Sequence, residues 1–308
     1  MERRELIKYT LMASAPAALL GRASAVSSRQ NANAIPDARL TAPLTVPASG
    51  DIRVGFLISP GAEVIDFAGP WGVFEYVTVG ETNREPFKLY TVAASKDPVK
   101  VTGGMTLVPD YTYVDSPVAD VLVVPAMDTK NLTPPTFDWL RSVHKGSAVT
   151  MSVCDGAFVL AAAGLLDGKK ATAHHGNYGM LRAMYPKVTV IRGVRYVEDG
   201  NIATSGGLSS GVDLAMRVVE RYFGRDVAQQ TALRLEYQGT GWMFPASNAQ
   251  FAKKPVGTAS NPICSVCEAQ ISRATALTWQ YHGKTYYFCS EFCKGHFMAD
   301  PQRYIDAA

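Results

Sequence analysis

The five cysteines of this 308-residue chain fall into two groups that suggest two kinds of chemistry. Cys154 stands alone in the middle of the sequence, whereas Cys264, Cys267, Cys289 and Cys293 crowd together near its end. A single well-placed thiol can act as a nucleophile. Four clustered thiols can bind a metal ion or pair into two disulfides. The sequence therefore predicts two separate sites.

Cys154 is expected where a buried strand, 148–153, meets a helix, 156–166. In an open α/β sheet, ligands bind at the carboxyl ends of strands, next to helix N-termini. The helix dipole there favours the thiolate, and backbone N–H groups can stabilise an anion. Gly156 permits the close packing that a nucleophile elbow requires. The alternative is a structural cysteine in the core, where free cysteines are often found.

Strands and helices alternate from residue 51 onward, as a parallel α/β sheet requires. Apolar runs predict strands at 52–59, 89–94, 121–124, 148–153, 188–191, 194–197 and 202–204. Helical patterns cover 62–79, with an interruption at Gly69-Pro70, and also 134–144, 156–166 and 208–223. We expect a doubly wound, mainly parallel sheet with helices on both faces. This domain spans 51–240, and the polar segment 241–260, rich in Pro, Ala and Ser, is predicted to be a linker.

Several motifs of this domain resemble the ThiJ/PfpI family of glutamine-amidotransferase-like proteins. They are Val-Gly-Phe-Leu-Ile at 54–58, Asp-Phe-Ala-Gly-Pro at 66–70, Ser-Val-Cys-Asp-Gly-Ala at 152–157, Ala-Ala-Ala-Gly-Leu-Leu-Asp-Gly-Lys at 161–169, Ala-Thr-Ala-His at 171–174 and Thr-Ser-Gly-Gly at 204–207. The resemblance covers about 51–235. It is closest to the isonitrile hydratases and to the amidase-like domains of AraC-type regulators. It implies a flavodoxin-like sheet, often dimeric, with the cysteine on an elbow. This domain carries no cofactor motif, and we expect its chemistry to need no cofactor.

The resemblance also implies roles for individual residues. The family's acidic partner of the cysteine corresponds to Asp66, and the histidine often found nearby corresponds to His174. For an isonitrile, Cys154 would attack the terminal carbon to give a thioimidate. Asp66 would supply the carbon-bound proton and then help water to release an N-formamide. Two plainer alternatives are that Asp66 caps a helix turn and that His174 is a surface residue.

Three features depart from that pattern. Isonitrile hydratases have Thr after the cysteine, whereas this chain has Asp155, whose charge would oppose thiol ionisation. A Gly-Gly pair usually follows the strand that ends at Pro125, but here Ala126 and Met127 follow, so Met127 would offer its N–H to an anion. No helix-turn-helix pattern follows residue 225. These departures leave the substrate open, and a glyoxalase-like or amidase-like activity stays possible.

Residues 261–308 form a second module with paired cysteine spacing. Two residues separate Cys264 from Cys267, and three separate Cys289 from Cys293. Four sulfur ligands suit tetrahedral zinc or copper(I). The segment resembles a YHS domain, which implies heavy-metal binding. So short a module has little core, and a metal would contribute to its folding. Two disulfides are the alternative if the protein is exported.

The N-terminus carries an export pattern. Arg3 and Arg4 precede an uncharged stretch, 9–20, and an Ala-Ser-Ala site ends at Ala25. This pattern predicts a signal peptide at 1–25 that resembles the twin-arginine type, whose pathway exports folded proteins to the periplasm. A disordered lead-in is predicted at 26–50. The alternative for the first segment is an amphipathic helix of a cytosolic protein.

Composition narrows the function classes. Hydrophobic residues make up 47% and charged residues 19% of the chain, which excludes wholesale disorder. The net charge of +3 gives no reason to expect nucleic-acid binding, and no apolar run reaches the roughly 18 residues of a membrane span. Two hypotheses remain. One is an exported cysteine-dependent hydratase or hydrolase of a small electrophile, with an appended metal-binding module. The other is a metal sensor or carrier whose larger domain is catalytically silent.

Overall fold

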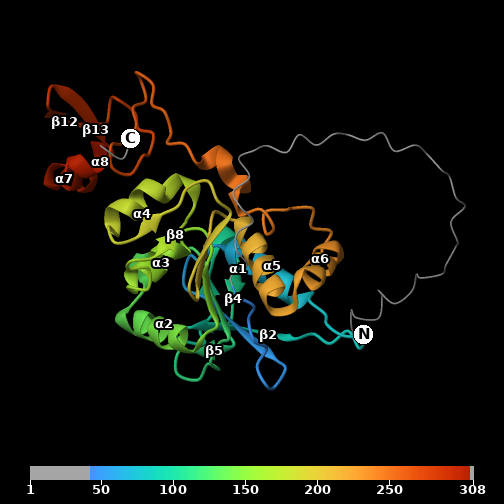
Figure 1. The fold of residues 1–308 in the computed structure, drawn as a ribbon. Helices are drawn as coiled ribbons and strands as arrows, with labels where there is room; N and C mark the ends of the chain where they lie inside the picture. Colours follow the sequence, from blue (N-terminus) through green and yellow to red (C-terminus); the bar gives the residue numbers. More distant parts are fainter. Residues whose placement is uncertain (1–41, 306–308) are drawn as a thin grey trace, which may run out of the picture. The chain divides into compact units, whose positions relative to one another are not determined.

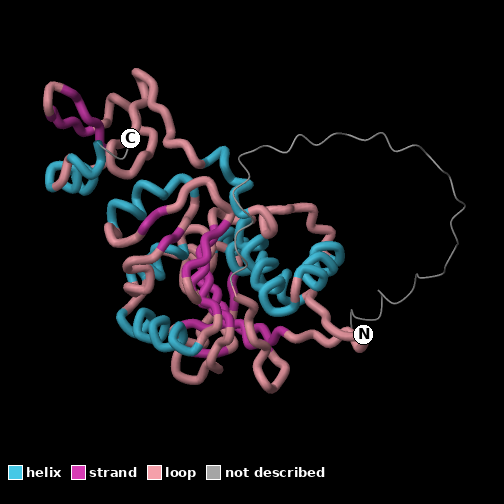
Figure 2. Tube along the Cα trace, viewed as in Figure 1, coloured by secondary structure: helices cyan, strands magenta, loops and turns pink. Residues whose placement is uncertain are grey.

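A seven-stranded sheet forms the centre of the larger domain in the computed structural model, which describes residues 42–305 (Figures 1 and 2). Its order is β10-β11-β7-β6-β1-β2-β5, and every neighbouring pair is parallel except β10 with β11. The strands are β1 (Ile52–Leu57), β2 (Phe87–Ala93), β5 (Tyr111–Thr112), β6 (Val121–Val124), β7 (Val149–Ser152), β10 (Tyr196–Asp199) and β11 (Ile202–Ser205). This is the doubly wound, mainly parallel sheet that the sequence predicts.

Helices cover both faces of this sheet, which is why the central strands are apolar runs without alternation (Figure 1). One face carries α1 (Val64–Glu75) and α5 (Ser210–Phe223), which pack against each other. The other face carries α2 (Pro134–Gly146) and α3 (Gly156–Ala162). Two further helices complete the domain, α4 (Tyr178–Met184) and α6 (Arg225–Arg234).

Helix α1 continues through Pro70, although the sequence predicts an interruption at Gly69-Pro70. Proline cannot donate a backbone hydrogen bond and usually bends or ends a helix. Here Pro70 is buried together with Phe67, Val73 and Phe74 on the face that packs against the domain core. Asp66 lies in the first turn of this helix, on the same buried face.

The shortest strands differ from the sequence-based expectation. The predicted strand at 188–191 is only β9 (Thr189–Val190), which pairs with β8 (Lys170–Ala171) outside the main sheet. The hairpin of β3 (Val99–Lys100) and β4 (Thr106–Leu107) was not predicted. Strands of two residues are too short to show an alternating pattern.

Parts of the predicted linker and lead-in pack against the larger domain. Trp242 is buried, and its carbonyl accepts a 2.7 Å hydrogen bond from the Tyr196 hydroxyl. A 3-10 segment follows at Pro245–Phe251. In the lead-in, the Leu44 N–H donates to the carbonyl of Arg221 at 2.8 Å. The predicted signal peptide at 1–25 lies outside the described residues.

The C-terminal module has a hairpin and two short helices around a small core. The hairpin pairs β12 (Leu277–Tyr281) with β13 (Lys284–Phe288), and α7 (Glu291–Ala299) and α8 (Gln302–Ile305) follow. His282 and Gly283 both have positive φ, as a tight two-residue hairpin turn requires. The Ser290 side chain accepts a hydrogen bond from the Cys293 N–H and so caps α7.

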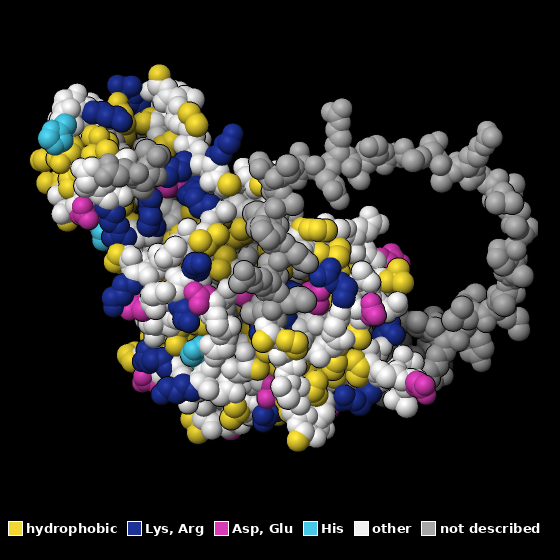
Figure 3. Space-filling model, in the orientation of Figure 1, with side chains coloured by type: hydrophobic (Ala, Val, Ile, Leu, Met, Phe, Trp, Pro, Cys, Tyr) yellow, Lys and Arg dark blue, Asp and Glu magenta, His cyan; other side chains and the backbone are white. Residues whose placement is uncertain are grey.

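Within residues 42–305, no helix combines the length and apolar character that crossing a bilayer requires. Basic and acidic side chains are interspersed on the face of the molecule drawn in Figure 3. This mixture agrees with the small net charge of the sequence.

Candidate functional site

Cys154 lies at a sharp turn between β7 and α3, as the sequence predicts. Its φ of 58° is the left-handed conformation, which a non-glycine residue adopts only under constraint. The Cys154 N–H donates a 3.0 Å hydrogen bond to the carbonyl of Gly206, which anchors the turn to the loop after β11. A Cβ atom on Gly156 would lie 2.1 Å from the carbonyl oxygen of Val124. Only glycine therefore lets α3 begin so close to β6.

The Cys154 sulfur receives hydrogen bonds from the backbone N–H groups of Asp155 and Leu208. These donors favour the thiolate, but the side chain is only 7% exposed. Burial, followed by the charges of Asp66 and Asp155, raises the pKa of Cys154 to about 12. The sequence-based expectation of a resting thiolate is therefore wrong. At neutral pH the group is a thiol, because the seven-residue helix α3 cannot outweigh burial and two carboxyl groups.

Asp66 lies in the first turn of α1 and is completely buried. Its Oδ2 accepts a 3.0 Å hydrogen bond from the Ala126 N–H, while Oδ1 has no partner among the described residues. Asp66 thus bonds to the loop after β6 rather than capping α1. Burial raises the pKa of Asp66 to about 7, and the charges of Glu63 and Asp155 act in the same direction. The carboxyl group can therefore exchange a proton near neutral pH.

Asp155 is held by two neutral donors. The Asn177 amide donates to Oδ2 at 2.5 Å, and the backbone N–H of His174 also donates to the carboxylate. Its Oδ1 is buried and has no partner within the described residues. Burial raises the pKa of Asp155, whereas the Asn177 amide, the charge of His174 and the His174 backbone N–H oppose that rise. Sequence reasoning missed Asn177, because its role depends on a contact between distant loops that no motif indicates.

His174 is placed beside Asp155 rather than on the sulfur. Its Nδ1 accepts a 3.2 Å hydrogen bond from the Gly176 N–H. Its ring packs against Gly207, where a Cβ atom would come within 2.3 Å of Cδ2. No hydrogen bond joins this ring to Cys154 in the described part of the chain. The catalytic role that the resemblance implied for His174 has no direct contact to support it.

Met127 follows Ala126 in the loop after β6, and its side chain is buried in the core. Its N–H donates to no acceptor in residues 42–305, which leaves it available to an anion as the sequence analysis proposed. Leu208, which sequence reasoning missed, provides one of the two N–H groups that reach the sulfur. The Gly206-Gly207 pair before it is typical of a tight turn after a strand, and that turn carries this donor.

The family model described as DJ-1/PfpI family matches residues 52–221, more than half of the chain. This chain belongs to the DJ-1/PfpI family. The YHS domain model matches residues 265–308. Both resemblances drawn from the sequence motifs are thereby confirmed.

Curated relatives of this DJ-1/PfpI protein include both an enzyme and regulators. It is 33% identical over 193 residues to the isonitrile hydratase of Pseudomonas putida, covering 60% of this chain and 78% of that one. It is 26% identical over 179 residues to the HTH-type transcriptional regulator CdhR of Pseudomonas aeruginosa, covering 58% and 52%. It is 28% identical over 185 residues to Protein DJ-1alpha of Drosophila melanogaster, covering 57% and 80%.

Solved structures show the same fold. A ThiJ/PfpI family protein from Pseudomonas syringae is 27% identical with a TM-score of 0.55, and the match covers 70% of this chain and 85% of that one. Drosophila melanogaster DJ-1beta is 21% identical with a TM-score of 0.52, covering 61% and 100%. The second likeness concerns the fold alone.

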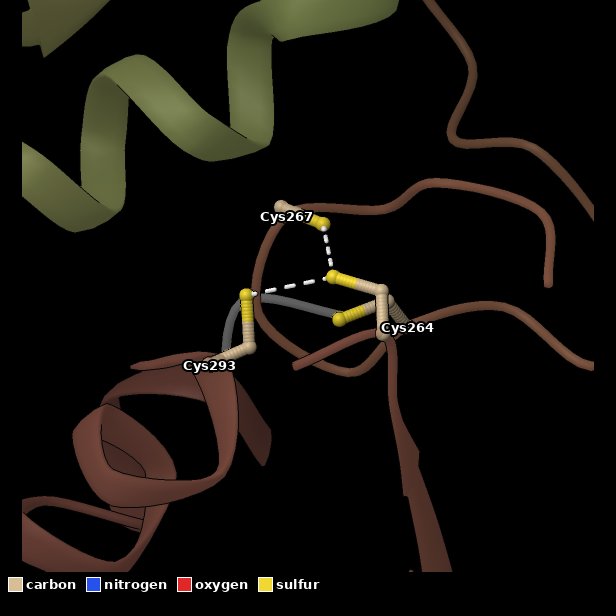
Figure 4. A group of neighbouring side chains, drawn as sticks. Cys264, Cys267 and Cys293 are labelled. Carbon is tan, nitrogen blue, oxygen red and sulfur yellow. Dashed lines mark hydrogen bonds between the residues drawn. The ribbon is translucent and has the colours of Figure 1, made fainter. Parts of the chain in front are cut away.

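The four C-terminal cysteines of this DJ-1/PfpI protein bring their sulfurs within 4.8 Å of one another. Cys289 Sγ lies 3.5 Å from the sulfurs of both Cys267 and Cys293. Figure 4 shows the sulfurs of Cys264, Cys267 and Cys293 pointing toward one another. A tetrahedral zinc–thiolate site places its sulfurs about 3.8 Å apart. All four cysteines are free in the structure, and their donor set fits zinc or copper(I).

The loop that carries Cys267 is held by a pair of arginines. The next residue, Glu268, forms ion pairs with Arg192 at 2.7 Å and with Arg182 at 3.4 Å. Its side chain is 10% exposed, so these contacts are shielded from water. Contacts that fix the backbone beside a ligand help to orient that ligand toward a metal.

Proposed function

We propose that this protein is a cysteine-dependent hydratase of small isonitriles. One observation carries the proposal: the buried carboxyl group of Asp66 interacts electrostatically with the Cys154 thiol. The pKa of this carboxyl group is raised to about 7. Such a carboxylate can accept the thiol proton and return it to a substrate atom. The similarity to the isonitrile hydratase of Pseudomonas putida supports this choice within the family.

In the first step the Asp66 carboxylate takes the proton from the Cys154 thiol. The sulfur then forms a bond to the terminal carbon of the isonitrile, and Asp66 returns the same proton to that carbon. The product is a thioimidate, R–N=CH–S–Cys154. Charge that develops during the attack can be stabilised by the unused N–H of Met127 and by the donors around the sulfur.

In the second step water adds to the thioimidate carbon. One proton of the water passes through a carboxylate to the substrate nitrogen, and the tetrahedral intermediate then releases Cys154 as a thiol. The product is an N-formamide, and the sum of the two steps is the addition of one water to one isonitrile. Asp66 is the base for this step, and Asp155 adds a second carboxylate beside the same sulfur.

The four-cysteine centre has a different role in this proposal. Zinc or copper(I) would be held by Cys264, Cys267, Cys289 and Cys293, and four thiolate ligands leave no open position for chemistry. The metal would stabilise a module whose own core is small. Export by a twin-arginine route to the periplasm and assembly as a homodimer are further parts of the proposal.

A metal sensor or carrier with a silent larger domain is the second candidate. The raised pKa of Cys154 and the convergence of four sulfurs favour it. On this alternative the protein would bind metal stoichiometrically and would leave isonitriles unchanged.

The test is turnover of tert-butyl isocyanide by the full chain loaded with zinc, followed by NMR of the formamide product. We expect the native protein to form N-tert-butylformamide and the Cys154→Ala variant to lose this activity. The Asp138→Asn variant, altered on the exposed surface of α2, should retain it. Equal turnover by native and Cys154→Ala protein, or none by either, would overturn the proposed function.

A further inference from the structure

Two carboxyl groups from different elements act on the Cys154 thiol. Asp66 comes from the first turn of α1, and Asp155 is the residue that follows the thiol in the elbow. Each has one carboxylate oxygen that is buried and without a partner among the described residues. Both charges act on the sulfur. Any reagent that bonds to this sulfur therefore comes close to two carboxyl groups.

Two hydrogen bonds hold the Asp155 carboxyl group in place. Asn177 donates an amide hydrogen at 2.5 Å, and His174 donates its backbone N–H. Both donors are uncharged, and both favour the ionised form of the carboxyl group that they contact. Asn177 comes from the turn before α4, so the orientation of Asp155 depends on a segment far from it in sequence.

No basic side chain in the described part of the chain forms an ion pair with Asp66 or Asp155. The His174 ring forms no hydrogen bond with either carboxyl group in residues 42–305, and its Nδ1 atom accepts one from the Gly176 N–H. The pKa of His175 is lowered by burial and by His174. The guanidinium group of Arg195 pairs with the buried carboxylate of Asp213 at 2.5 Å.

We propose that Asp155 is a specificity-determining residue that, together with Asp66, restricts Cys154 to electrophiles without negative charge, and that Asn177 is the positioning residue for Asp155. This inference rests on the proposed function and narrows its substrates. Neutral isonitriles, or isonitriles bearing an ammonium group, can approach the sulfur. Isonitriles bearing a carboxylate or a phosphate are repelled. Threonine at this position would carry no such charge.

The experiment compares alkylation of Cys154 by iodoacetamide, which is neutral, and iodoacetate, which is an anion. In both reactions the S–C bond forms, iodide leaves and the thiol proton is lost. The full chain is loaded with zinc, and the peptide containing Cys154 is followed by mass spectrometry. The ratio of the two rates is the readout, because any change in the thiolate fraction affects both reagents equally.

The rate of alkylation by iodoacetamide divided by the rate with iodoacetate is measured for Cys154 and for 2-mercaptoethanol as a reference thiol. We expect this ratio to be larger for Cys154 by about tenfold or more. Asp155→Asn should lower it by about tenfold, and Asn177→Ala should lower it in the same direction while keeping both carboxyl groups. Asp138→Asn should leave it unchanged. If Asp155→Asn does not fold, Asn177→Ala decides the question.

A native ratio equal to that of 2-mercaptoethanol, or a ratio unmoved by both substitutions, would overturn the inference. Alkylation requires no turnover, which separates the two proposals. If isonitriles are hydrated but the ratio does not respond to Asp155, charge selection fails alone. If the ratio responds but isonitriles are not hydrated, the proposed function fails alone. Failure of both reagents to reach Cys154 would contradict both.

Discussion

The pKa values of Cys154 and Asp66 suit a reaction in which both the sulfur and a proton are added to the substrate, rather than attack by a thiolate alone. The pKa of the thiol is about 12 and that of the carboxyl group about 7, so at neutral pH the pair stores one transferable proton on sulfur. An isonitrile carbon must gain both a nucleophile and a proton. A thiol with an adjacent base supplies both to the same atom.

The pH dependence of turnover follows from Asp66. Its pKa is raised, so below about pH 7 the group is protonated and cannot accept the thiol proton. We expect kcat/KM for tert-butyl isocyanide to rise with pH through about 7 and then to level off. Asp66→Asn should lower kcat by about 10²–10⁴-fold and abolish this rise. An unchanged profile in Asp66→Asn would show that another group is titrating.

Asp66→Asn, which should lower activity, should raise the free energy of unfolding at high pH. The pKa of Asp66 is about 7 in the native state and near its ordinary value of 3.8 in the unfolded state, so the native state binds the proton more tightly. Stability contributed by this group is complete only below pH 3.8, falls as the pH rises above that value, and is lost once the pH has passed 7. Asp66→Asn should therefore stabilise the protein at pH 8, by up to about 4 kcal/mol, and much less at pH 5. Urea unfolding at both pH values measures this difference.

At the residue scale, residues that lie in recognisable motifs were predictable from the sequence. Properties that depend on burial in the folded protein were not. Cys154 and Asp66 were found because each lies in a recognisable motif. The predicted ionisation state of Cys154 was wrong, because no motif shows that this side chain is only 7% exposed. Asn177 and the Leu208 N–H escaped notice, since they act through contacts that only the folded loops create.

The elbow between β7 and α3 depends on how closely two elements can approach. Helix α3 begins so near the end of β6 that Gly156 has no room for a side chain. Cys154, two residues earlier, has a left-handed backbone, and its N–H donates to Gly206 in the loop after β11. The position of the sulfur therefore depends on contacts between elements and not on the cysteine alone.

Gly156→Ala tests this dependence. The added Cβ atom would lie 2.1 Å from the Val124 carbonyl oxygen, so the helix must move and the free energy of unfolding should fall by about 1–3 kcal/mol. Turnover should fall as well. Gly72→Ala in α1 is the matched control, because no heavy atom lies within 4 Å of its Cβ position. That variant should be neutral or slightly more stable in thermal unfolding. Equal effects of both substitutions would contradict the packing argument.

Strands and helices were predictable from the sequence where consecutive residues are apolar and buried. The strands β1, β6, β7 and β11 are almost entirely buried, and their apolar runs marked them. Helix α6 was not predicted, because only Ala228 and Thr231 are buried in it and its pattern is weak. The packing of Trp242 against the larger domain was also not predicted, because one buried tryptophan does not alter the polar composition of the 241–260 segment.

At the scale of the whole molecule, the chain joins a large self-sufficient core to a small module. The larger domain buries an extensive apolar cluster, whereas the C-terminal cluster has few members and includes Cys264, Cys267 and Cys293. Cysteine ligands are thus part of the core that they would stabilise. This arrangement predicts that metal binding and folding of the module are coupled.

Removal of the metal tests this coupling. We expect a chelator, added to reduced zinc-loaded protein, to accelerate amide hydrogen exchange in β12, β13 and α7, while β6 and β7 of the larger domain remain protected. Cys264→Ser should show the same loss without chelator. Cys154→Ser is the control, because its cysteine lies outside the cluster, and it should still bind one zinc. Exchange in the module that does not respond to zinc would rule out a structural metal.

The most direct test of the central claim is the mass of the Cys154 peptide after rapid quenching of the zinc-loaded protein with excess tert-butyl isocyanide. The account predicts a species heavier by one isonitrile on that peptide, absent from Cys154→Ala and formed much more slowly by Asp66→Asn. Formamide production without any such adduct, or an adduct that forms equally fast in Asp66→Asn, would contradict it.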